Sequence, residues 1–368
     1  MPIKKQMHKV LYGTGILALM VCGCTGRLAS AGSTDTIPAP LSYSQQAAAG
    51  VQSLQQWYSQ SSGIYTSPTG WWNAANAITV IANYTAASKS TQYVSVLSQT
   101  FANAPGSQGH ANFINNYYDD SGWWALAWIA AYDATGNTSY LMMAETIFTY
   151  MTAGWDNVCG GGLYWNTANR YKNAIPNELF LDVAAKLANR TTGTASASYL
   201  AWAQKEWIWF NNSSMINSSN LVNDGLSSSC VNNNGQEWTY NQGVILAGLV
   251  ELYKADKDAT LLPKATAIAN AAITKLVDPN GILVEASVTG GDAPQFKGIF
   301  MRNLMALYQA APNSQYKNFI DANANSIWRN DQGPGYEFGA LWQGPFDSAD
   351  ATRQTSVLDT LIAAMEIQ

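Results

Sequence analysis

The sequence predicts an all-α protein folded as an (α/α)6 barrel, a double ring of six helical hairpins. Three observations predict this fold. Apolar residues recur at three- and four-residue spacing, which is typical of amphipathic helices, in twelve windows along the chain. Windows that are apolar on nearly all sides alternate with windows that have one polar face. The alternation repeats every ~50–60 residues, a period that indicates a repeat architecture with two helices per unit.

The predicted helices are separated by turns or longer connections. They cover residues 42–59, 70–84, 90–103, 121–134, 139–153, 177–190, 197–211, 239–254, 259–276, 298–309, 315–329 and 355–367. The windows that should be buried on most sides begin near residues 70, 121, 177, 239, 298 and 355. Strand patterns are scarce, and the best two predict short strands at 281–284 and 163–165.

The order of the two kinds of helix favours a closed ring over an open solenoid. Each buried-type window except the last is followed, after a short turn, by a window with a polar face. A solenoid of helix pairs would have the same period, but it needs polar terminal helices, and the last window resembles a buried one. We therefore expect the first helix to pack beside the last. No low-complexity linker interrupts the pattern, so residues 32–368 are predicted to form a single domain.

The first 31 residues have the pattern of a secretory signal peptide. Lys4, Lys5 and Lys9 precede an apolar run over residues 10–24, and small residues follow at 29–31. The run is too short to span a bilayer, and no later segment reaches about 18 apolar residues. We expect a secreted protein without a membrane span. A lipoprotein anchored at Cys24 is the alternative, although Cys22 fits that motif poorly.

The composition favours a neutral, hydroxyl-rich ligand. Charged residues make up 12% of the chain, whereas about 25% is usual in soluble domains. The net charge of −5 disfavours nucleic acid and anionic membranes as partners. The 14 tryptophans and 19 tyrosines provide flat apolar faces with one polar group each, although at least half of these rings should belong to the core. We expect a monomer.

Two cysteines follow the predicted signal peptide, Cys159 and Cys230. Each lies in a loop rich in glycine, asparagine or serine, which favours pairing over burial. In an oxidising compartment they are predicted to form a disulfide that closes a loop of about 70 residues.

The long connections indicate where a functional site would lie. They precede the buried-type helices at about 104–120, 154–176, 212–238, 277–297 and 330–354, so a closed ring places them all at one rim. Their last residues are rich in aromatic, amide and acidic side chains, which should converge on a central cavity. This composition is expected of a sugar-binding cleft.

Asp119 and Asp120 are the candidate catalytic residues at this rim. One aspartate at a helix start is usually an N-cap, but an N-cap does not account for two adjacent acids between aromatic residues. Adjacent Cα atoms are ~3.8 Å apart, so the two carboxyl groups can approach the ~5–5.5 Å separation of retaining glycosidases. Elimination also favours carboxylate chemistry. His110 is the only histidine after the signal, so a histidine metal site or a Ser-His-Asp triad is disfavoured. No phosphate-binding or dinucleotide motif is found, and we expect no metal or cofactor.

Several motifs resemble those of glycoside hydrolase family 76, which comprises bacterial endo-α-1,6-mannanases and related fungal wall proteins. In chain order the motifs are Tyr117-Tyr118-Asp119-Asp120 with Trp123-Trp124-Ala125-Leu126-Ala127, Cys159-Gly160-Gly161-Gly162-Leu163-Tyr164-Trp165, Lys172-Asn173-Ala174 with Asn177-Glu178, Thr239-Tyr240-Asn241-Gln242-Gly243 and Phe296-Lys297-Gly298-Ile299-Phe300. Together they cover about residues 45–365.

The resemblance implies an (α/α)6 barrel and retaining cleavage of α-1,6-linked mannose chains. By this match Asp119 would be the nucleophile and Asp120 the general acid/base. The predicted substrate-binding residues are Trp72, Asn76, Tyr118, Trp123, Lys172, Asn173, Glu178, Tyr240, Asn241, Gln242, Phe296 and Lys297. Two other functions stay open: a transglycosidase acting on mannan-type glycans, and a glycan-binding barrel without catalysis. The substrate expected is α-mannan.

Overall fold

A computed structural model describes residues 40–66 and 68–368. In these residues the chain forms twelve α-helices, one for each predicted window. The predicted signal peptide and the alternative lipidation site at Cys24 lie outside the described residues. None of the described helices is both long and apolar enough to span a bilayer.

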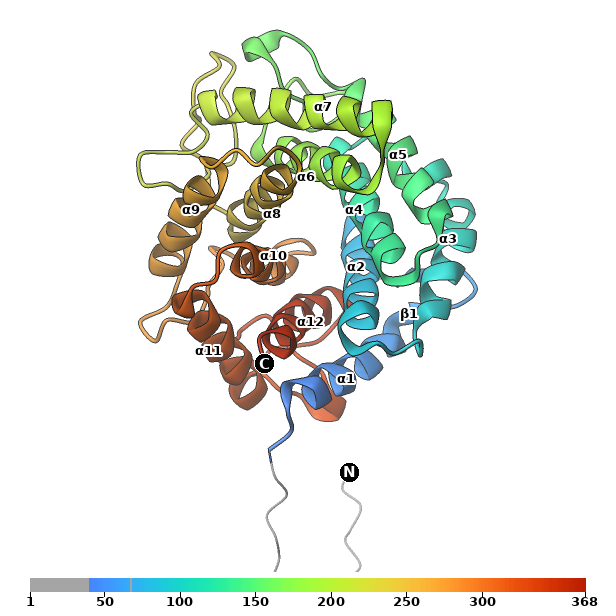
Figure 1. Ribbon diagram of the computed structural model, residues 1–368. Coiled ribbons are helices and arrows are strands. Elements are labelled where there is room, and N and C mark those ends of the chain that lie inside the picture. Colours follow the sequence, from blue (N-terminus) through green and yellow to red (C-terminus); the bar gives the residue numbers. More distant parts are fainter. Residues whose placement is uncertain (1–39, 67) are drawn as a thin grey trace, which may run out of the picture. The chain divides into compact units, whose positions relative to one another are not determined.

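The helices of Leu41–Gln368 form two concentric rings (Figure 1). The inner ring contains α2 (Trp71–Ser88), α4 (Tyr118–Thr135), α6 (Ala174–Arg190), α8 (Thr239–Asp256), α10 (Phe296–Ala310) and α12 (Ala351–Glu366). The outer ring contains α1 (Tyr43–Leu54), α3 (Val94–Gln108), α5 (Thr138–Thr152), α7 (Gly193–Asn212), α9 (Leu261–Lys275) and α11 (Ser314–Asn330). Each inner helix contacts the next, and α12 contacts α2. The first helix, α1, packs on the last, α12. The ring is therefore closed, and the predicted (α/α)6 barrel is confirmed.

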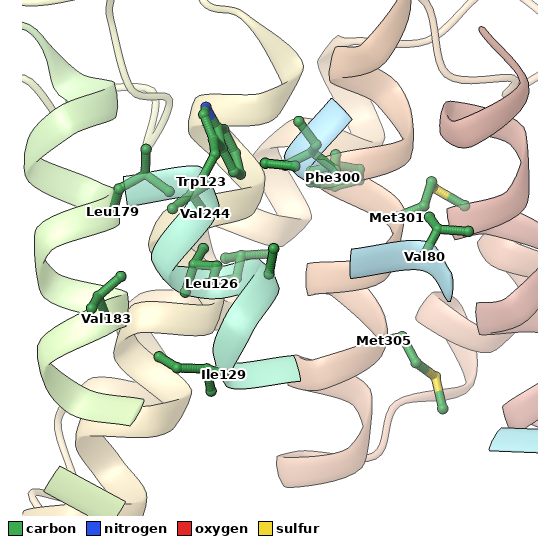
Figure 2. Packing of buried hydrophobic residues seen from close by; sticks show 14 of the residues in the cluster. Val80, Trp123, Leu126, Ile129, Leu179, Val183, Val244, Phe300, Met301 and Met305 are labelled. Atoms are coloured by element: carbon green, nitrogen blue, oxygen red, sulfur yellow. The ribbon is translucent and has the colours of Figure 1, made fainter. Parts of the chain in front are cut away.

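Side chains from the inner helices fill the ring with an apolar cluster (Figure 2). Val80 of α2, Leu126 and Ile129 of α4, Val183 of α6 and Met301 of α10 belong to it, and each is buried. Burying a side chain of this size contributes about 1.5–3 kcal/mol. This cluster explains why the inner windows are apolar on nearly all sides, because one face meets the ring interior and the other meets the outer helices.

Two glycines allow neighbouring inner helices to approach closely. A Cβ atom on Gly243 of α8 would lie 2.6 Å from the Cα atom of Phe300 on α10. A Cβ atom on Gly298 of α10 would overlap the backbone of Ser356 on α12. Both helix pairs therefore need a residue without a side chain at these positions.

Some inner helices begin earlier than the apolar pattern predicts. Helix α12 begins at Ala351 rather than near 355, because Asp350 caps it by accepting a hydrogen bond from the backbone N–H of Arg353 at 2.9 Å. Helix α4 begins at Tyr118 rather than at 121, with Tyr117 at the N-cap. Asp119 and Asp120 therefore lie in the first turn of α4 and do not cap it.

The two predicted strands were wrong. Leu163 and Leu283 each take part in only one isolated bridge, to Trp155 and Val277 respectively. Among the described residues the paired strands are β1 (Tyr58–Ser59) and β2 (Ile64–Tyr65), which form a short hairpin. The remaining regular elements are the 3-10 turns η1 (Gln55–Trp57), η2 (Ala111–Phe113), η3 (Val158–Gly160), η4 (Ala293–Gln295) and η5 (Pro334–Tyr336). Apolar runs as short as three or four residues do not distinguish a strand from an extended loop that packs on the core.

Candidate active site

A cavity of about 510 Å³ lies where the first turns of inner helices meet the long connections. Its lining residues are Trp72, Tyr117, Asp119, Asp120, Trp123, Trp165, Tyr171, Asn173, Asp224, Tyr240, Asp292 and Phe296. The first turns of α2, α4, α8 and α10 all contribute to it, as the closed ring predicts. The charged residues in this lining are four aspartates.

Four aromatic rings from four inner helices form one connected surface in the cavity. Trp72 and Trp123 stack with ring centroids 5.6 Å apart, and Tyr240 and Phe296 stack at 3.9 Å with an interplanar angle of 8°. The rings of Trp123 and Tyr240 join the two pairs at 6.5 Å. Such a surface is suited to the apolar C–H faces of a sugar, while hydroxyl groups at the sugar's edge can meet the aspartates.

Asp119 is held by two N–H donors. Its Oδ2 accepts a hydrogen bond from the indole nitrogen of Trp165 at 2.8 Å, and its Oδ1 accepts one from the backbone N–H of Asp120 at 3.0 Å. Burial and the adjacent charge of Asp120 raise the pKa of Asp119 well above its ordinary value, and the two N–H donors oppose that rise.

Asp120 has a different set of neighbours. Its Oδ2 accepts a hydrogen bond from the side-chain amide of Asn115 at 2.6 Å. Asn115 is fixed in turn, because its backbone carbonyl accepts a hydrogen bond from the hydroxyl of Tyr150 at 2.9 Å. Burial, and then the charge of Asp292, raise the pKa of Asp120 to about 6. The two aspartates thus form a pair that can hold one proton in mildly acidic solution, as a general acid and an ionised partner require.

Residues of two further connections complete the walls. The hydroxyl of Tyr171 donates to Oδ2 of Asp224 and accepts from the side-chain amide of Asn233 at 2.9 Å. The indole nitrogen of Trp72 donates to Oδ1 of Asp292 at 2.8 Å. Four connections, before α4, α6, α8 and α10, therefore meet at the cavity.

The whole folded unit matches one protein family. Residues 42–368 match the model of glycosyl hydrolase family 76. The chain belongs to this family.

Individual relatives agree with the family 76 assignment. The chain is 28% identical over 285 residues to the mannan endo-1,6-alpha-mannosidase DCW1 of Eremothecium gossypii, an alignment that covers 70% of this chain and 62% of that protein. It is 28% identical over 345 residues to the mannan endo-1,6-alpha-mannosidase DFG5 of Candida albicans, which covers 83% and 74%. The chain therefore spans 62% and 74% of the length of these two relatives.

A solved family 76 structure has the same fold. It is an inactive variant of the alpha-1,6-mannanase GH76A of Salegentibacter sp. HEL1_6 in complex with alpha-1,6-mannotriose. The TM-score is 0.81 at 19% sequence identity, over 89% of this chain and 100% of that chain.

The structure brings five of the twelve predicted substrate-binding residues to the cavity. They are Trp72, Trp123, Asn173, Tyr240 and Phe296. The side-chain oxygen of Asn173 is buried and has no hydrogen-bond partner among the described residues. An unsatisfied acceptor at this position is available to a sugar hydroxyl.

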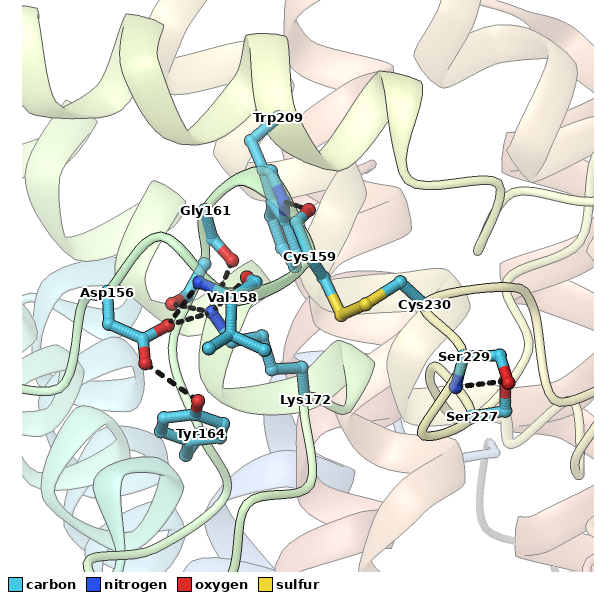
Figure 3. The surroundings of a disulfide bond; sticks show 11 residues. Asp156, Val158, Cys159, Gly161, Tyr164, Lys172, Trp209, Ser227, Ser229 and Cys230 are labelled. Carbon is cyan, nitrogen blue, oxygen red and sulfur yellow. Dashed lines mark hydrogen bonds and ion pairs between the residues drawn. A yellow bond between two sulfur atoms is a disulfide. The ribbon is translucent and has the colours of Figure 1, made fainter.

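The other seven predicted residues do not line the cavity. They are Asn76, Tyr118, Lys172, Glu178, Asn241, Gln242 and Lys297. The ammonium of Lys172 contacts Asp156 at 2.6 Å and donates to the carbonyls of Val158, Gly161 and Gly162 (Figure 3). The ammonium of Lys297 donates a hydrogen bond to the carbonyl of Ala340 at 2.8 Å.

The remaining five are also occupied or enclosed within the protein. Asn76 accepts a hydrogen bond from Arg302. The side-chain amide of Gln242 accepts a hydrogen bond from the backbone N–H of Val222 and donates one to its carbonyl. Tyr118 packs against the ring of Tyr150 at 5.3 Å. Glu178 and Asn241 are fully buried, and their side-chain polar atoms have no hydrogen-bond partner among the described residues.

Five other residues line the cavity that were not predicted from the sequence. Tyr117 and Trp165 lie within the recognised motifs, where their aromatic character was a usable signal. Tyr171, Asp224 and Asp292 lie in irregular connections, where no periodicity indicates the direction of a side chain.

The predicted disulfide between Cys159 and Cys230 is confirmed, with Cα atoms 5.1 Å apart (Figure 3). It joins the connection that carries Trp165 and Tyr171 to the one that carries Asp224. Two walls of the cavity are thus covalently linked close to the point where Lys172 binds the carbonyls of residues 158, 161 and 162.

A second cavity of about 230 Å³ lies toward the C-terminal ends of the inner helices. Four of its six charged residues pair with each other: Lys186 contacts Asp182 at 2.6 Å, and Arg302 contacts Asp359 at 3.0 Å. A fifth, Asp133, contacts Arg190 at 2.6 Å. Because five of these six charged residues are already paired within the protein, the cavity that holds Asp119 and Asp120 is the stronger candidate for chemistry. No group of three or more metal-binding side chains was found in residues 40–66 and 68–368.

Proposed function

We propose that this family 76 protein is a retaining endo-α-1,6-mannanase, with Asp119 as the nucleophile and Asp120 as the general acid/base. One observation carries the proposal: two adjacent carboxyl groups with raised pKa values lie in a cavity lined by stacked aromatic rings. Carboxyl pairs of this kind perform glycoside hydrolysis.

The substrate class comes from the relatives. Two of them are named as mannan endo-1,6-alpha-mannosidases, which also favours hydrolysis over the transglycosidase alternative. The Salegentibacter mannanase structure holds alpha-1,6-mannotriose in a variant made inactive by changing two adjacent aspartates to asparagine. This chain also has two adjacent aspartates, at the start of α4.

The hydrogen bonds suggest which aspartate has which role. A nucleophile must be ionised, and Asp119 accepts two N–H hydrogen bonds, which favour the charged form. A general acid must carry a proton, and Asp120 has one side-chain donor, Asn115, and faces the negative charge of Asp292. The pair titrates as a unit, so the proton it holds is shared between the two groups.

The proposed reaction has two steps. In the first, Asp120 protonates the glycosidic oxygen while a carboxylate oxygen of Asp119 attacks the anomeric carbon, so the C–O bond to the leaving chain breaks. In the second, Asp120 takes a proton from water, whose oxygen attacks the anomeric carbon and releases Asp119. Each step inverts the anomeric carbon, and two inversions give net retention.

The surrounding residues fit the binding of a neutral sugar chain. The joined rings of Trp72, Trp123, Tyr240 and Phe296 offer apolar faces to successive sugar rings. Asn173 and Asp224 supply acceptors for hydroxyl groups in the same cavity. We further propose that the protein is a secreted monomer whose catalytic domain covers residues 32–368.

A substrate panel tests the proposed function. Purified protein is incubated with linear α-1,6-mannan, branched α-mannan and β-1,4-mannan, and the products are sized over time. We expect a rapid fall in chain length with linear α-1,6-mannan and no cleavage of β-1,4-mannan. The double variant Asp119→Asn, Asp120→Asn is the control, because it keeps side-chain size and removes the carboxylates. If the wild-type protein leaves linear α-1,6-mannan intact, or if the control cleaves it equally well, the proposed function is wrong.

A further inference from the structure

Asp292 is a third carboxylate in the cavity that holds Asp119 and Asp120, but it comes from a different part of the chain. It lies in the connection before α10, immediately before η4. Asp119 and Asp120 lie in the first turn of α4. The cavity therefore brings together an acid from the last third of the chain and the proposed catalytic pair.

Asp292 is exposed at the cavity, and its carboxylate is held by one hydrogen bond from Trp72. The indole nitrogen of Trp72 donates to Oδ1 of Asp292 at 2.8 Å, across 220 residues of sequence. The Trp72 ring is itself held between two other rings. Its centroid lies 5.6 Å from that of Trp123, on which it stacks, and 6.1 Å from that of Phe296. A donor in a rigid aromatic group limits the orientations that the carboxylate can adopt.

The two members of the catalytic pair meet unlike environments. Asp119 is contacted by two N–H donors, which stabilise a carboxylate. Asp120 has the Asn115 amide on one side and Asp292 in the same cavity, and a nearby negative charge disfavours ionisation. The other titratable groups lining the cavity are Tyr117, Tyr171, Asp224 and Tyr240. Asp224 and Asp292 each accept a hydrogen bond from a neutral side chain, Tyr171 and Trp72 respectively. Of these two acids outside α4, it is Asp292 whose charge raises the pKa of Asp120.

We propose that Asp292 is a positioning residue that directs the shared proton of the pair to Asp120 and leaves Asp119 ionised for attack. This inference rests on the proposed function, because it assigns the acid step to Asp120. It is supported by the raised pKa of Asp120, to which the charge of Asp292 contributes after burial. Asp292 itself does not exchange a proton with the substrate in this account.

The pH dependence of kcat/KM on linear α-1,6-mannan tests the inference. Asp292→Asn keeps an oxygen that can accept from Trp72 and removes the charge. We expect the alkaline limb of the profile to move to lower pH by about 0.5–1 unit, because one nearby charge no longer holds the proton on the pair. Above that limb, activity should fall up to about tenfold relative to wild type at the same pH.

Asp278→Asn is the matched control. Asp278 lies in the same connection, and its Oδ1 accepts backbone N–H bonds from Asn280 and Ile282, which asparagine can also accept. It does not line the cavity. Its profile should coincide with that of the wild type. If Asp292→Asn lowers the plateau but leaves the alkaline limb in place, Asp292 has a structural role only and the inference is wrong.

A second readout separates this inference from the proposed function. Aspartate side chains are labelled with carbon-13, and their carboxyl signals are titrated by NMR in the free protein. The Asp120→Asn variant identifies the Asp120 signal. A lower apparent pKa of that signal in Asp292→Asn supports the inference even if the wild type does not cleave mannan, and an unchanged pKa overturns it even if the wild type does.

Discussion

The indole nitrogen of Trp165 donates a hydrogen bond to Oδ2 of Asp119 at 2.8 Å, so a residue of one helical hairpin positions the proposed nucleophile of another. Trp165 is itself fixed by two backbone hydrogen bonds, to the carbonyl of Tyr171 at 2.8 Å and from the N–H of Tyr118 at 3.0 Å. The proposed catalytic pair therefore depends on the packing of two neighbouring connections, and not on α4 alone.

Substitution of each aspartate should have a distinct effect on turnover. Asp120→Ala should lower kcat on mannan by roughly 10²–10⁴-fold, because the leaving oxygen is no longer protonated. Activity should partly return with an aryl mannoside substrate and added azide, since an aryl leaving group needs little protonation and azide can replace activated water. Asp119→Ala should lose at least as much activity, and azide should not restore retaining turnover. Azide rescue of the Asp119 variant alone, with retention, would reverse the two assignments.

The same aspartates should make the folded state less stable at neutral pH. Burial raises the pKa of Asp120 from its ordinary value of 3.8 to about 6 in the folded protein, and it also raises the pKa of Asp119. Folding therefore favours the protonated forms. The resulting stabilisation is complete below about pH 3.8 and is lost as the pH rises through about 6. Asp120→Asn should raise the free energy of unfolding at pH 7 by roughly 1 kcal/mol, after allowing for solvent screening at a half-buried group.

Thermal unfolding at pH 4 and pH 7 checks this expectation. The Tm difference between Asp120→Asn and the wild type should be positive at pH 7 and smaller at pH 4. If Asp120→Asn is less stable than the wild type at pH 7, the ionised aspartates do not destabilise the folded state as expected.

The variant Lys172→Met tests whether Lys172 stabilises the fold or binds the substrate. The Lys172 side chain is nearly fully buried, and its ammonium bonds Asp156 and three backbone carbonyls. Lys172→Met should lower the free energy of unfolding by about 3–5 kcal/mol, because a partly buried carboxylate and three carbonyls lose their partner. The KM of the fraction that still folds should stay within a few-fold of wild type. A large rise in KM without loss of stability would instead support the substrate contact that the sequence predicts.

The disulfide should stabilise the fold and the cavity walls together. The double variant Cys159→Ser, Cys230→Ser should lose about 2–5 kcal/mol of stability, the range usual for removal of a native disulfide. Its KM for mannan should rise, because the bridge joins the connections that carry Trp165 and Asp224. The wild-type protein without its predicted signal peptide contains only the cysteines Cys159 and Cys230. Thiol counting after its denaturation should find no free sulfhydryl, and two free thiols would contradict the bridge.

The sequence predicted the barrel well because the signal for it is local and repeated. The 3.6-residue period marks each helix independently, and the two kinds of helix indicate which face is buried. It also indicated Asp119 and Asp120, because two adjacent acids at a helix start have few purely structural explanations. The boundary of α12 was missed because the cap at Asp350 is polar and lies ahead of the apolar pattern.

The cavity walls could not be predicted in the same way. Lys172 and Asn173 are neighbours in one motif, yet Asn173 lines the cavity and Lys172 faces the carbonyls of residues 158–162. Asn173 forms an isolated bridge with Gly225, and such pairings between connections set the direction of each side chain. Asp224 and Asp292 reach the cavity through similar irregular segments. Their positions depend on contacts between residues far apart in the sequence.

The stereochemistry of the first product shows whether Asp119 acts as the nucleophile. Wild-type protein is mixed with a short linear α-1,6-manno-oligosaccharide, and the anomeric proton of the new reducing end is followed by NMR before mutarotation. We expect the α-anomer to appear first and the β-anomer only later, because adjacent carboxylates act by double displacement. Initial appearance of the β-anomer would mean single displacement by water, and Asp119 would not be the nucleophile.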